Sequence, residues 1–428
     1  MSNPLSDNDL VDRRHRERSR GAAVLFFMIS VCTLIVIGCK PRQVERDTPQ
    51  MSAENVYWIR VRLLSRVSRC AIETPGRFTV VSDPNLPIPN GGGEKLVLSL
   101  SRNRLYLGEH PIDARELDIE FGKPDIFSVD GVRYRGKAKV VVRDDAQSFD
   151  LINWVPLEPY LAGVIGAEMP GFWESEALKT QAVVARTYCL FIKGRFGKNR
   201  LWDLSKTQAH QVYRGVQAES PTVWEAVKAT HGQVLTIPTD DDPEAIFPTY
   251  YSSICGGHTE NSKYVFGDSY ACLQGVHCFY CQDVAKINQF YWPVATYSKR
   301  AVSDRLIKRY PSLKKLGTIQ EIVPMVQSEQ PGIARFTRVT LVGANGKTDT
   351  LRGEDLRLCI DSSGRTIRST VCTLADWGSQ WAFESGQGWG HGVGLCQCGA
   401  QALARRGRTQ QEILSYYYPG ARIKHLYE

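Results

Sequence analysis

The residue pattern of the chain changes abruptly at Pro156, and this change limits the folds that the chain can adopt. From Tyr57 to about Trp154, short runs of alternating or β-branched residues are separated by glycine, proline and asparagine, a pattern typical of β-strands. Over Leu157–Ala167 and Glu174–Lys193, apolar residues recur every three or four positions, which predicts two helices. Because helices and strands are partly segregated, the sequence predicts an α+β fold and not a wound parallel sheet.

Further elements are expected after these two helices. A capping serine and a leading proline predict a helix over Pro221–His231, and strands are expected from Val234 to about Cys359. Two short helices near Gln401 and Thr409 close the chain, the second with the pattern of a capping box. The expected architecture is therefore a helical core with mixed or antiparallel β-sheets, preceded by a β-rich region at residues 56–154.

The amino terminus has the pattern of an export signal. A basic segment at residues 13–20 precedes an uncharged apolar run at residues 22–38, and the run ends in Val-Ile-Gly directly before Cys39. This ending resembles the lipobox of bacterial lipoproteins, so we expect a signal peptide at residues 1–38, a lipidated Cys39 and a polar tether at residues 39–55. The alternative is an uncleaved single-span anchor, since 17 apolar residues are near the lower limit for spanning a bilayer. Either anchor predicts a protein of the cell envelope, on the extracytoplasmic side of the membrane.

The charge balance is modestly basic. Lys and Arg number 53 against 45 Asp and Glu, a formal net charge of +8, which suits an anionic envelope polymer. Outside residues 13–20 the sequence has no basic run, and it has no motif for reading DNA or RNA. Nucleic acid is therefore not an expected partner.

Cysteine usage favours a metal site. The chain has 12 cysteines, of which Cys32 and Cys39 belong to the signal segment. Their uneven spacing leaves disulfide pairing open, although Cys359 and Cys372 are candidates for a bridge.

A C-x-x-H pair and a C-x-x-C pair lie close together in the sequence. Cys255 and His258 form the first pair, Cys278 and Cys281 form the second, and 19 residues separate the two pairs. This spacing is typical of two knuckles around one tetrahedral zinc ion, and four protein ligands leave no open position, so the metal is expected to be structural and not that of a zinc hydrolase. The alternatives are a Cys278–Cys281 disulfide, or a zinc site in which His210 or His277 replaces one ligand.

One carboxylate stands at the end of an otherwise apolar helix. Glu168 is flanked by Val164, Ile165 and Met169. A carboxyl group among apolar neighbours is more readily kept protonated at neutral pH, as a general acid requires. The alternative is an ordinary glutamate on a solvated helix end.

Glycine occupies every second position from Gly386 to Gly394. In an extended chain this spacing places the intervening side chains on one face and bare backbone on the other, so a flat ring, such as that of a sugar in the family reading given below, could approach closely. The alternative is that the glycines only allow tight packing. The side chains concerned are Gln387, Trp389, His391 and Val393.

Six stretches of the chain resemble the SpoIID/LytB family of peptidoglycan lytic transglycosylases, in the order that the family has them. They span most of residues 155–425. These stretches are Tyr160 to Pro170, Glu176 to Tyr188, Gln211 to Gly215, Gly256 to Asn261, Gly388 to Gly394 and Tyr417 to Gly420. The chain departs from the family at Cys396-Gln397-Cys398, where relatives often have Ser-Gln followed by an aromatic residue.

The resemblance implies a catalytic domain at residues 155–428 that cleaves the MurNAc–GlcNAc bond and leaves 1,6-anhydroMurNAc ends. It implies that Glu168 is the catalytic acid and base, and that a glycan groove is lined by Trp389 or His391, with Arg186 and Tyr188 also contacting substrate. Glu260 is among the alternative carboxylates. Some relatives bind zinc near the segment before Gln-Val-Tyr, where this chain has only His210.

A second function follows from the same resemblance. Some family members are modifiers that hold glycan and stimulate a partner amidase without cleaving the strand themselves. The expected partners are therefore peptidoglycan strands, the membrane through the anchor, and an amidase.

Overall fold

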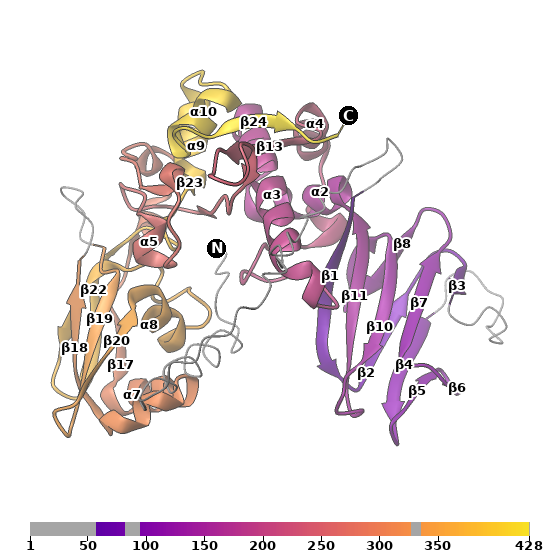
Figure 1. Ribbon diagram of the computed structural model, residues 1–428, viewed down its shortest axis with the longest axis horizontal. Helices are drawn as coiled ribbons and strands as arrows, with labels where there is room; N and C mark the ends of the chain where they lie inside the picture. Colours follow the sequence, from indigo (N-terminus) through magenta and orange to yellow (C-terminus); the bar gives the residue numbers. More distant parts are fainter. Residues whose placement is uncertain (1–56, 82–94, 327–334, 428) are drawn as a thin grey trace, which may run out of the picture. The chain divides into compact units, whose positions relative to one another are not determined.

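The computed structural model describes residues 57–81, 95–326 and 335–427 (Figure 1). The expected α+β architecture with β-rich sheets at the amino terminus is confirmed. None of the helices in these ranges is both long enough and apolar enough to span a bilayer. The expected signal peptide, tether and lipidated Cys39 lie outside the described residues.

The amino-terminal region forms two six-stranded sheets. Their orders are β12-β1-β11-β10-β7-β3 and β6-β5-β4-β2-β8-β9, and buried positions alternate along β1 and β4 because successive side chains point to opposite faces. The strands are β1 Trp58–Val67, β2 Arg69–Glu73, β3 Phe78–Val80, β4 Lys95–Ser101, β5 Arg104–Leu107, β6 His110–Ile112, β7 Glu116–Phe121, β8 Ile126–Val129, β9 Val132–Arg135, β10 Lys137–Val142 and β11 Phe149–Pro156, joined by β12 Leu204–Ser205.

The helical core follows directly on β11. Helix α2 spans Leu157–Glu168, α3 spans Ser175–Phe196 and α4 spans Pro221–Ala229, each within three residues of the expected bounds. Ser220 caps α4 by accepting a hydrogen bond from the Val223 amide. Helix α3 is almost entirely buried over its middle turns because it packs against α2, α4, α9 and α10. It is therefore the central support of this part of the molecule.

Short elements lead from the helical core into the second half of the chain. The parallel pair β15–β23 and the antiparallel sheet β14-β13-β24 lie next to the helices. The elements are η1 Gly197–Asn199, η2 Gly215–Ala218, β13 Gln233–Ile237, β14 Ala245–Ile246, β15 Tyr251–Ser252, α5 Ser262–Val265, η3 Ala271–Leu273, η4 Cys281–Asp283 and α6 Ile287–Phe290.

Residues 291–387 form a lobe with its own hydrophobic core. Helices α7 and α8 lie beside the sheets β18-β19-β20 and β16-β22-β17 (Figure 1), and buried residues from Trp292 to Phe383 fill the space between them. The expectation of strands alone over Val234–Cys359 was therefore incomplete, because short amphipathic helices cover the sheet. The elements are β16 Tyr291–Trp292, β17 Ala295–Ser298, α7 Lys299–Arg309, η5 Pro311–Leu316, β18 Ile319–Met325, β19 Arg338–Gly343, β20 Thr348–Arg352, α8 Gly353–Ile360, β21 Val371–Asp376 and β22 Gln380–Gln387.

The chain then returns to the helical core. Strand β23 Leu395–Cys396 pairs in parallel with β15, and α9 Gln397–Arg405, α10 Gln410–Tyr417 and β24 Arg422–His425 follow. The expected capping box is confirmed: the Thr409 hydroxyl accepts from the Glu412 amide, and the Glu412 carboxylate accepts from the Thr409 amide.

Candidate functional site

Glu168 is the last residue of α2, where the helix meets the segment around η2. Helix α2 can approach η2 closely because Gly166 has no side chain: a Cβ there would lie 1.8 Å from the Ala218 carbonyl oxygen. The Glu168 side chain is half-buried. It is therefore held at a fixed place while staying accessible from outside.

Two donors reach the same oxygen of Glu168. The Val212 amide donates to Oε1 at 2.9 Å, and the Tyr251 hydroxyl of β15 donates to it at 3.3 Å. Within the described residues, no hydrogen bond reaches Oε2. The carboxyl group is therefore oriented through one oxygen, and the other stays available for a further contact.

The Gln-Val-Tyr segment is a buried support for Glu168. The Gln211 amide side chain accepts from the Tyr160 hydroxyl at 3.1 Å and donates to the Ala185 carbonyl at 3.2 Å. The Tyr213 hydroxyl donates to the Asn153 side chain at 3.1 Å. These contacts fix the backbone at Val212, between Gln211 and Tyr213. The Val212 amide is thereby held toward Glu168. Sequence reasoning matched this segment to a family but did not foresee this contact.

Tyr188 and Arg186, for which the resemblance implied substrate contact, are both fully buried. Tyr188 is fully buried, its ring packs 6.4 Å from that of Tyr251, and burial raises the pKa of its hydroxyl. Tyr188 therefore supports Tyr251 by ring packing, and its expected contact with substrate stays a prediction.

Arg186 is also fully buried. Its Nε and Nη2 donate to the Glu158 carboxylate at 2.8 and 2.7 Å, and its Nη1 donates to the Gln233 carbonyl at 3.1 Å. An arginine that is enclosed in this way holds α3 to α2. This setting favours a structural role for Arg186, and its expected contact with glycan stays a prediction.

The glycine-rich segment is not a flat, extended strand. Gly388, Gly390, Gly392 and Gly394 all have positive φ, between 70° and 109°. A Cβ on Gly394 would lie 2.1 Å from the Tyr250 carbonyl oxygen, and one on Gly390 would lie 2.8 Å from the Ser252 Cβ. The bare backbone therefore faces the β15 segment of the protein itself, and tight packing replaces the expected approach of a sugar ring.

His391 is a buried member of this packing. Its side chain is 2% exposed, and its ring lies 5.0 Å from that of Phe266. Nδ1 accepts a hydrogen bond from the Val393 amide at 3.0 Å, and desolvation holds the pKa of the imidazole well below its ordinary value. A neutral, enclosed imidazole does not fit the expected contact with glycan.

Trp389 keeps part of its surface open. It is half-buried, the Arg368 guanidinium lies 4.6 Å from its ring centroid, and its backbone pairs with Ile254. Its expected role as a wall of the groove stays a prediction.

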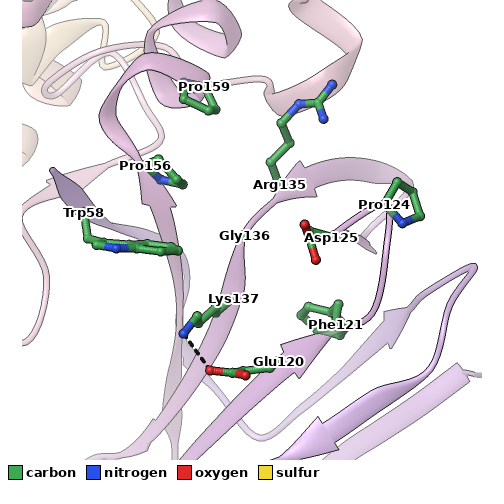
Figure 2. A pocket seen from close by; sticks show the side chains of 10 residues that line it. All are labelled: Trp58, Glu120, Phe121, Pro124, Asp125, Arg135, Gly136, Lys137, Pro156 and Pro159. Carbon is green, nitrogen blue, oxygen red and sulfur yellow. Dashed lines mark hydrogen bonds and ion pairs between the residues drawn. The ribbon is translucent and has the colours of Figure 1, made fainter. Parts of the chain in front are cut away.

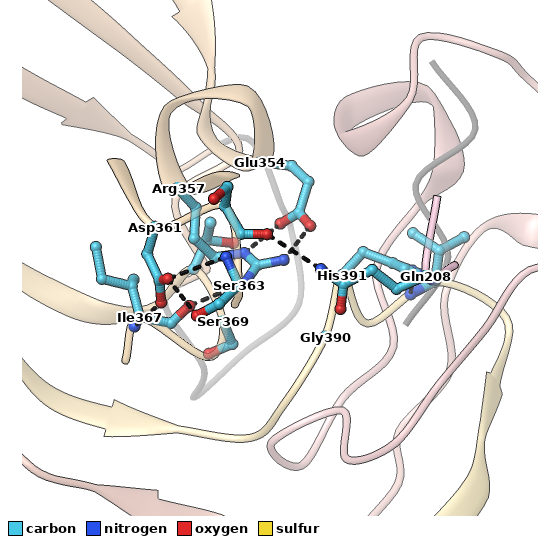
Figure 3. Close-up of polar contacts among 12 residues, drawn as sticks. Gln208, Glu354, Arg357, Asp361, Ser363, Ile367, Ser369, Gly390 and His391 are labelled. Atoms are coloured by element: carbon cyan, nitrogen blue, oxygen red, sulfur yellow. Dashed lines mark hydrogen bonds and ion pairs between the residues drawn. The ribbon is translucent and has the colours of Figure 1, made fainter. Parts of the chain in front are cut away.

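Buried charges lie beside the glycine-rich segment. Figure 3 shows Glu354 and Arg357, which form a buried ion pair, near His391 and Gly390. Glu260, the alternative carboxylate, is 3% exposed and joins the same packing, since its amide donates to the Gly392 carbonyl at 2.6 Å. Its burial makes it a supporting residue of the segment and a poor second acid.

Four buried thiols meet at one point. The sulfur atoms of Cys255, Cys278, Cys281 and Cys396 all lie within 4.8 Å of one another, so they can hold a metal ion. The expected fourth ligand is corrected: Cys396 joins the three cysteines, whereas His258 lies outside the group. Cys396 follows Cys255 by 141 positions, so sequence spacing gave no signal that the two would meet.

The histidines near this thiol group have other neighbours. The ring of His258 lies 5.0 Å from that of His277. His210 is buried, and its Nδ1 lies 2.9 Å from the Ser205 hydroxyl. All ten cysteines of the described residues are thiols, so the structure contains neither of the disulfides considered for Cys278–Cys281 and Cys359–Cys372.

A cavity of about 370 Å³ lies at the other end of α2 (Figure 2). Trp58 and Lys137 line it, and the Lys137 ammonium group is paired with the Glu120 carboxylate. Arg135, also on its wall, is paired with Glu219. The Lys137 and Arg135 side chains on its wall are therefore already paired with carboxylates of the protein.

Comparison with known proteins places this geometry in a family. Residues 145–237 match the model of the SpoIID family, described as stage II sporulation protein. The chain carries a SpoIID domain. The match covers β11, α2, α3 and α4, and thus includes both Glu168 and the Val212 amide.

Relatives of the chain extend the likeness beyond the matched residues. An uncharacterised protein of Brachyspira hyodysenteriae is 28% identical over 75% of this chain and 80% of its own length. Stage II sporulation protein D of Bacillus subtilis is 29% identical over 63% of this chain and 74% of its own length. The amidase enhancer of Bacillus subtilis is 27% identical over 69% of this chain, but the match spans less than half of that protein, 45%.

Proposed function

We propose that this SpoIID protein is a lytic transglycosylase that cleaves the MurNAc–GlcNAc bond of peptidoglycan strands. The main support for the proposal is the environment of the Glu168 side chain. Its carboxyl group is half-buried, is oriented through Oε1 by Val212 and Tyr251, and stands in a family domain. These are the properties of a general acid whose position must not vary.

The chemistry needs a single carboxyl group. Glu168 Oε2 donates its proton to the glycosidic oxygen as the bond to C1 of MurNAc breaks. The carboxylate then takes the proton of the muramyl 6-hydroxyl as that oxygen bonds to C1. The product is a 1,6-anhydro ring, and the acid is regenerated. Because the substrate supplies the nucleophile, the second carboxylate of ordinary glycosidases is not required.

The same proposal assigns a structural zinc ion to the four thiols. Zinc is commonly held by four cysteines, and four protein ligands leave no position for a reacting water. At a Zn–S distance of about 2.3 Å, neighbouring sulfurs of a tetrahedron are about 3.8 Å apart. The 3.7 Å between the sulfurs of Cys255 and Cys281 fits this geometry.

The place of action follows from the amino-terminal segment. We place the protein in the cell envelope, held to the membrane on the extracytoplasmic side by the lipid on Cys39 or by a single span. The net charge of +8 favours approach to an anionic wall polymer.

The second candidate is a glycan-binding modifier that stimulates a partner amidase. The relative named amidase enhancer supports this candidate. The two functions differ in what the isolated protein does: a modifier binds glycan and changes the rate of an added amidase, but produces no anhydro ends by itself.

The test is mass analysis of purified glycan strands after incubation with the purified full-length protein. Strands with stem peptides and strands without them are tested as separate substrates. If the protein is a transglycosylase, the fragments should end in 1,6-anhydroMurNAc. Fragments with ordinary reducing ends would indicate a hydrolase. Strands that are bound but uncut would favour the modifier.

A further inference from the structure

We infer that the four-thiol zinc site acts as a clamp that joins β23 to β15 and so holds Tyr251 against Glu168. The positioning of Tyr251 for catalysis rests on the proposed function, whereas the clamp itself does not. β15 and β23 pair over only two residues each, Tyr251 with Leu395 and Ser252 with Cys396. A ladder this short is not stable by itself.

The thiols lie at the ends of this short ladder. Cys396 is the last residue of β23, and Cys255 follows β15 by three positions. The Cys255 amide donates to the Cys396 sulfur at 3.3 Å, and the Cys398 amide donates to the Ser253 carbonyl at 3.1 Å. A metal ion bound to both thiolates would close the strand pair where its own hydrogen bonds end.

The remaining thiols connect the clamp to the base of the 291–387 lobe. Cys278 and Cys281 lie just before the lobe in the chain, and Cys396 lies just after it. One ion would therefore join the chain segments on both sides of the lobe. Without it, the two segments are held together by the packing of α9 against η4 and by surface contacts such as the Arg406–Asp283 ion pair.

The surroundings of the thiols suit a negatively charged metal centre. The Tyr417 hydroxyl lies 3.1 Å from the Cys278 sulfur, and Cys396 is the N-cap of α9, where helix amides favour a thiolate. Gly399 leaves the required space, since a Cβ there would lie 2.6 Å from the Cys278 sulfur and 2.0 Å from the Tyr417 hydroxyl oxygen. All four cysteines are fully buried, so they can be thiolates only with a bound cation.

The path from the thiols to the carboxyl group is short. Tyr251 is one of the two residues of β15 that pair with β23, and its hydroxyl contacts Glu168 at 3.3 Å. Loss of the metal would weaken the pairing of β15 with β23. Tyr251 would then lose its fixed distance to Glu168, and we assign it the role of a positioning residue under the control of the metal.

The first experiment measures the metal without using activity. Full-length protein, purified in detergent, should contain one zinc per chain. After exchange with Co²⁺ it should show the visible bands and sulfur-to-cobalt charge transfer of a tetrahedral four-thiolate site. Cys396→Ser should lose the metal or this spectrum, whereas Cys396→His should retain a metal. The matched control is Cys372→Ser, which changes a partly buried thiol outside the group. Metal-free protein with disulfides, or an unchanged spectrum in Cys396→Ser, would overturn the clamp.

The second experiment tests the coupling in unmodified protein. Removal of zinc by a chelator should raise amide exchange at Tyr251, Ser252 and Leu395 at least tenfold, and zinc should reverse the change. Glycan cleavage should fall while glycan binding is retained. Unchanged exchange would overturn the coupling. A zinc-loaded protein with protected strands but no cleavage would instead refute the proposed function and leave the clamp intact.

Discussion

At the scale of residues, the contact between Tyr251 and Glu168 is the least expected feature of the candidate site. We predict that Tyr251→Phe lowers glycan cleavage about tenfold to a hundredfold, because hydrogen bonds to charged groups contribute about 1.5–3 kcal/mol. The ring packing against Tyr188 is kept, so the melting temperature should change little. Steady-state cleavage of purified glycan measures the effect. Tyr188→Phe is the matched control, since among the described contacts its hydroxyl makes no bond to Glu168. Equal loss in both variants would assign the effect to packing.

A second prediction for a single residue concerns the buried ion pair of Arg186 with Glu158. Arg186→Met leaves the Glu158 carboxylate, which is 15% exposed, without its bidentate partner. Breaking a buried ion pair from one side costs about 3–5 kcal/mol, so we expect a fall of this size in the free energy of unfolding, measured by urea denaturation. The double variant Glu158→Gln/Arg186→Met should lose less than the two single losses combined. If Arg186→Met protein is as stable as the wild type but binds glycan more weakly, the result would contradict the structural role and support the substrate contact that the family resemblance implied.

At the scale of elements, the glycine-rich segment depends on close backbone approach. Gly394→Ala should be strongly destabilising, because its positive φ costs about 1–2 kcal/mol for a residue with a Cβ, and overpacking against the Tyr250 carbonyl adds about 1–3 kcal/mol. Gly407 provides the control. Its φ of 77° is close to the 70° of Gly394, but a Cβ there would have no atom within 4 Å. In thermal melts, the melting temperature of Gly394→Ala should be well below that of Gly407→Ala. Equal falls in melting temperature would mean that the clash is absent.

The sequence predicted the elements that depend on local residues. Periodicity and capping depend on residues that are about one helical turn apart in the sequence. They predicted the bounds of α2, α3 and α4 and the capping box of Thr409. Glu168 was located in the same way. Contacts between distant segments could not be read from periodicity: Cys396 reaches Cys255 only because β23 returns to β15 after the lobe. The alternation of glycines suggested a strand, but the left-handed backbone at these positions depends on what packs against them.

At the scale of the whole molecule, the expected lipid anchor decides where the protein acts. We predict that Cys39→Ala leaves a full-length, unlipidated precursor, because the thiol that receives the lipid is gone. Labelling with palmitate and mass analysis of the amino terminus measure this result. Wild-type protein that takes up no label and keeps residues 1–38 would instead be a single-span anchor.

The central claim is that Glu168 cleaves glycan as a single acid and base. Glu168→Gln keeps the shape of the side chain and an oxygen for the Val212 amide, but it has no proton to transfer. Glu174→Gln is the matched control, since this glutamate is exposed and follows α2 closely in the chain.

The most direct measurement is the rate at which each variant produces 1,6-anhydroMurNAc ends from purified glycan strands. General acid–base catalysis contributes about 10²–10⁴-fold, so folded Glu168→Gln protein should lose at least a hundredfold in rate and still bind glycan, whereas Glu174→Gln should keep the wild-type rate. Folded Glu168→Gln protein that produces anhydro ends near the wild-type rate would contradict the account.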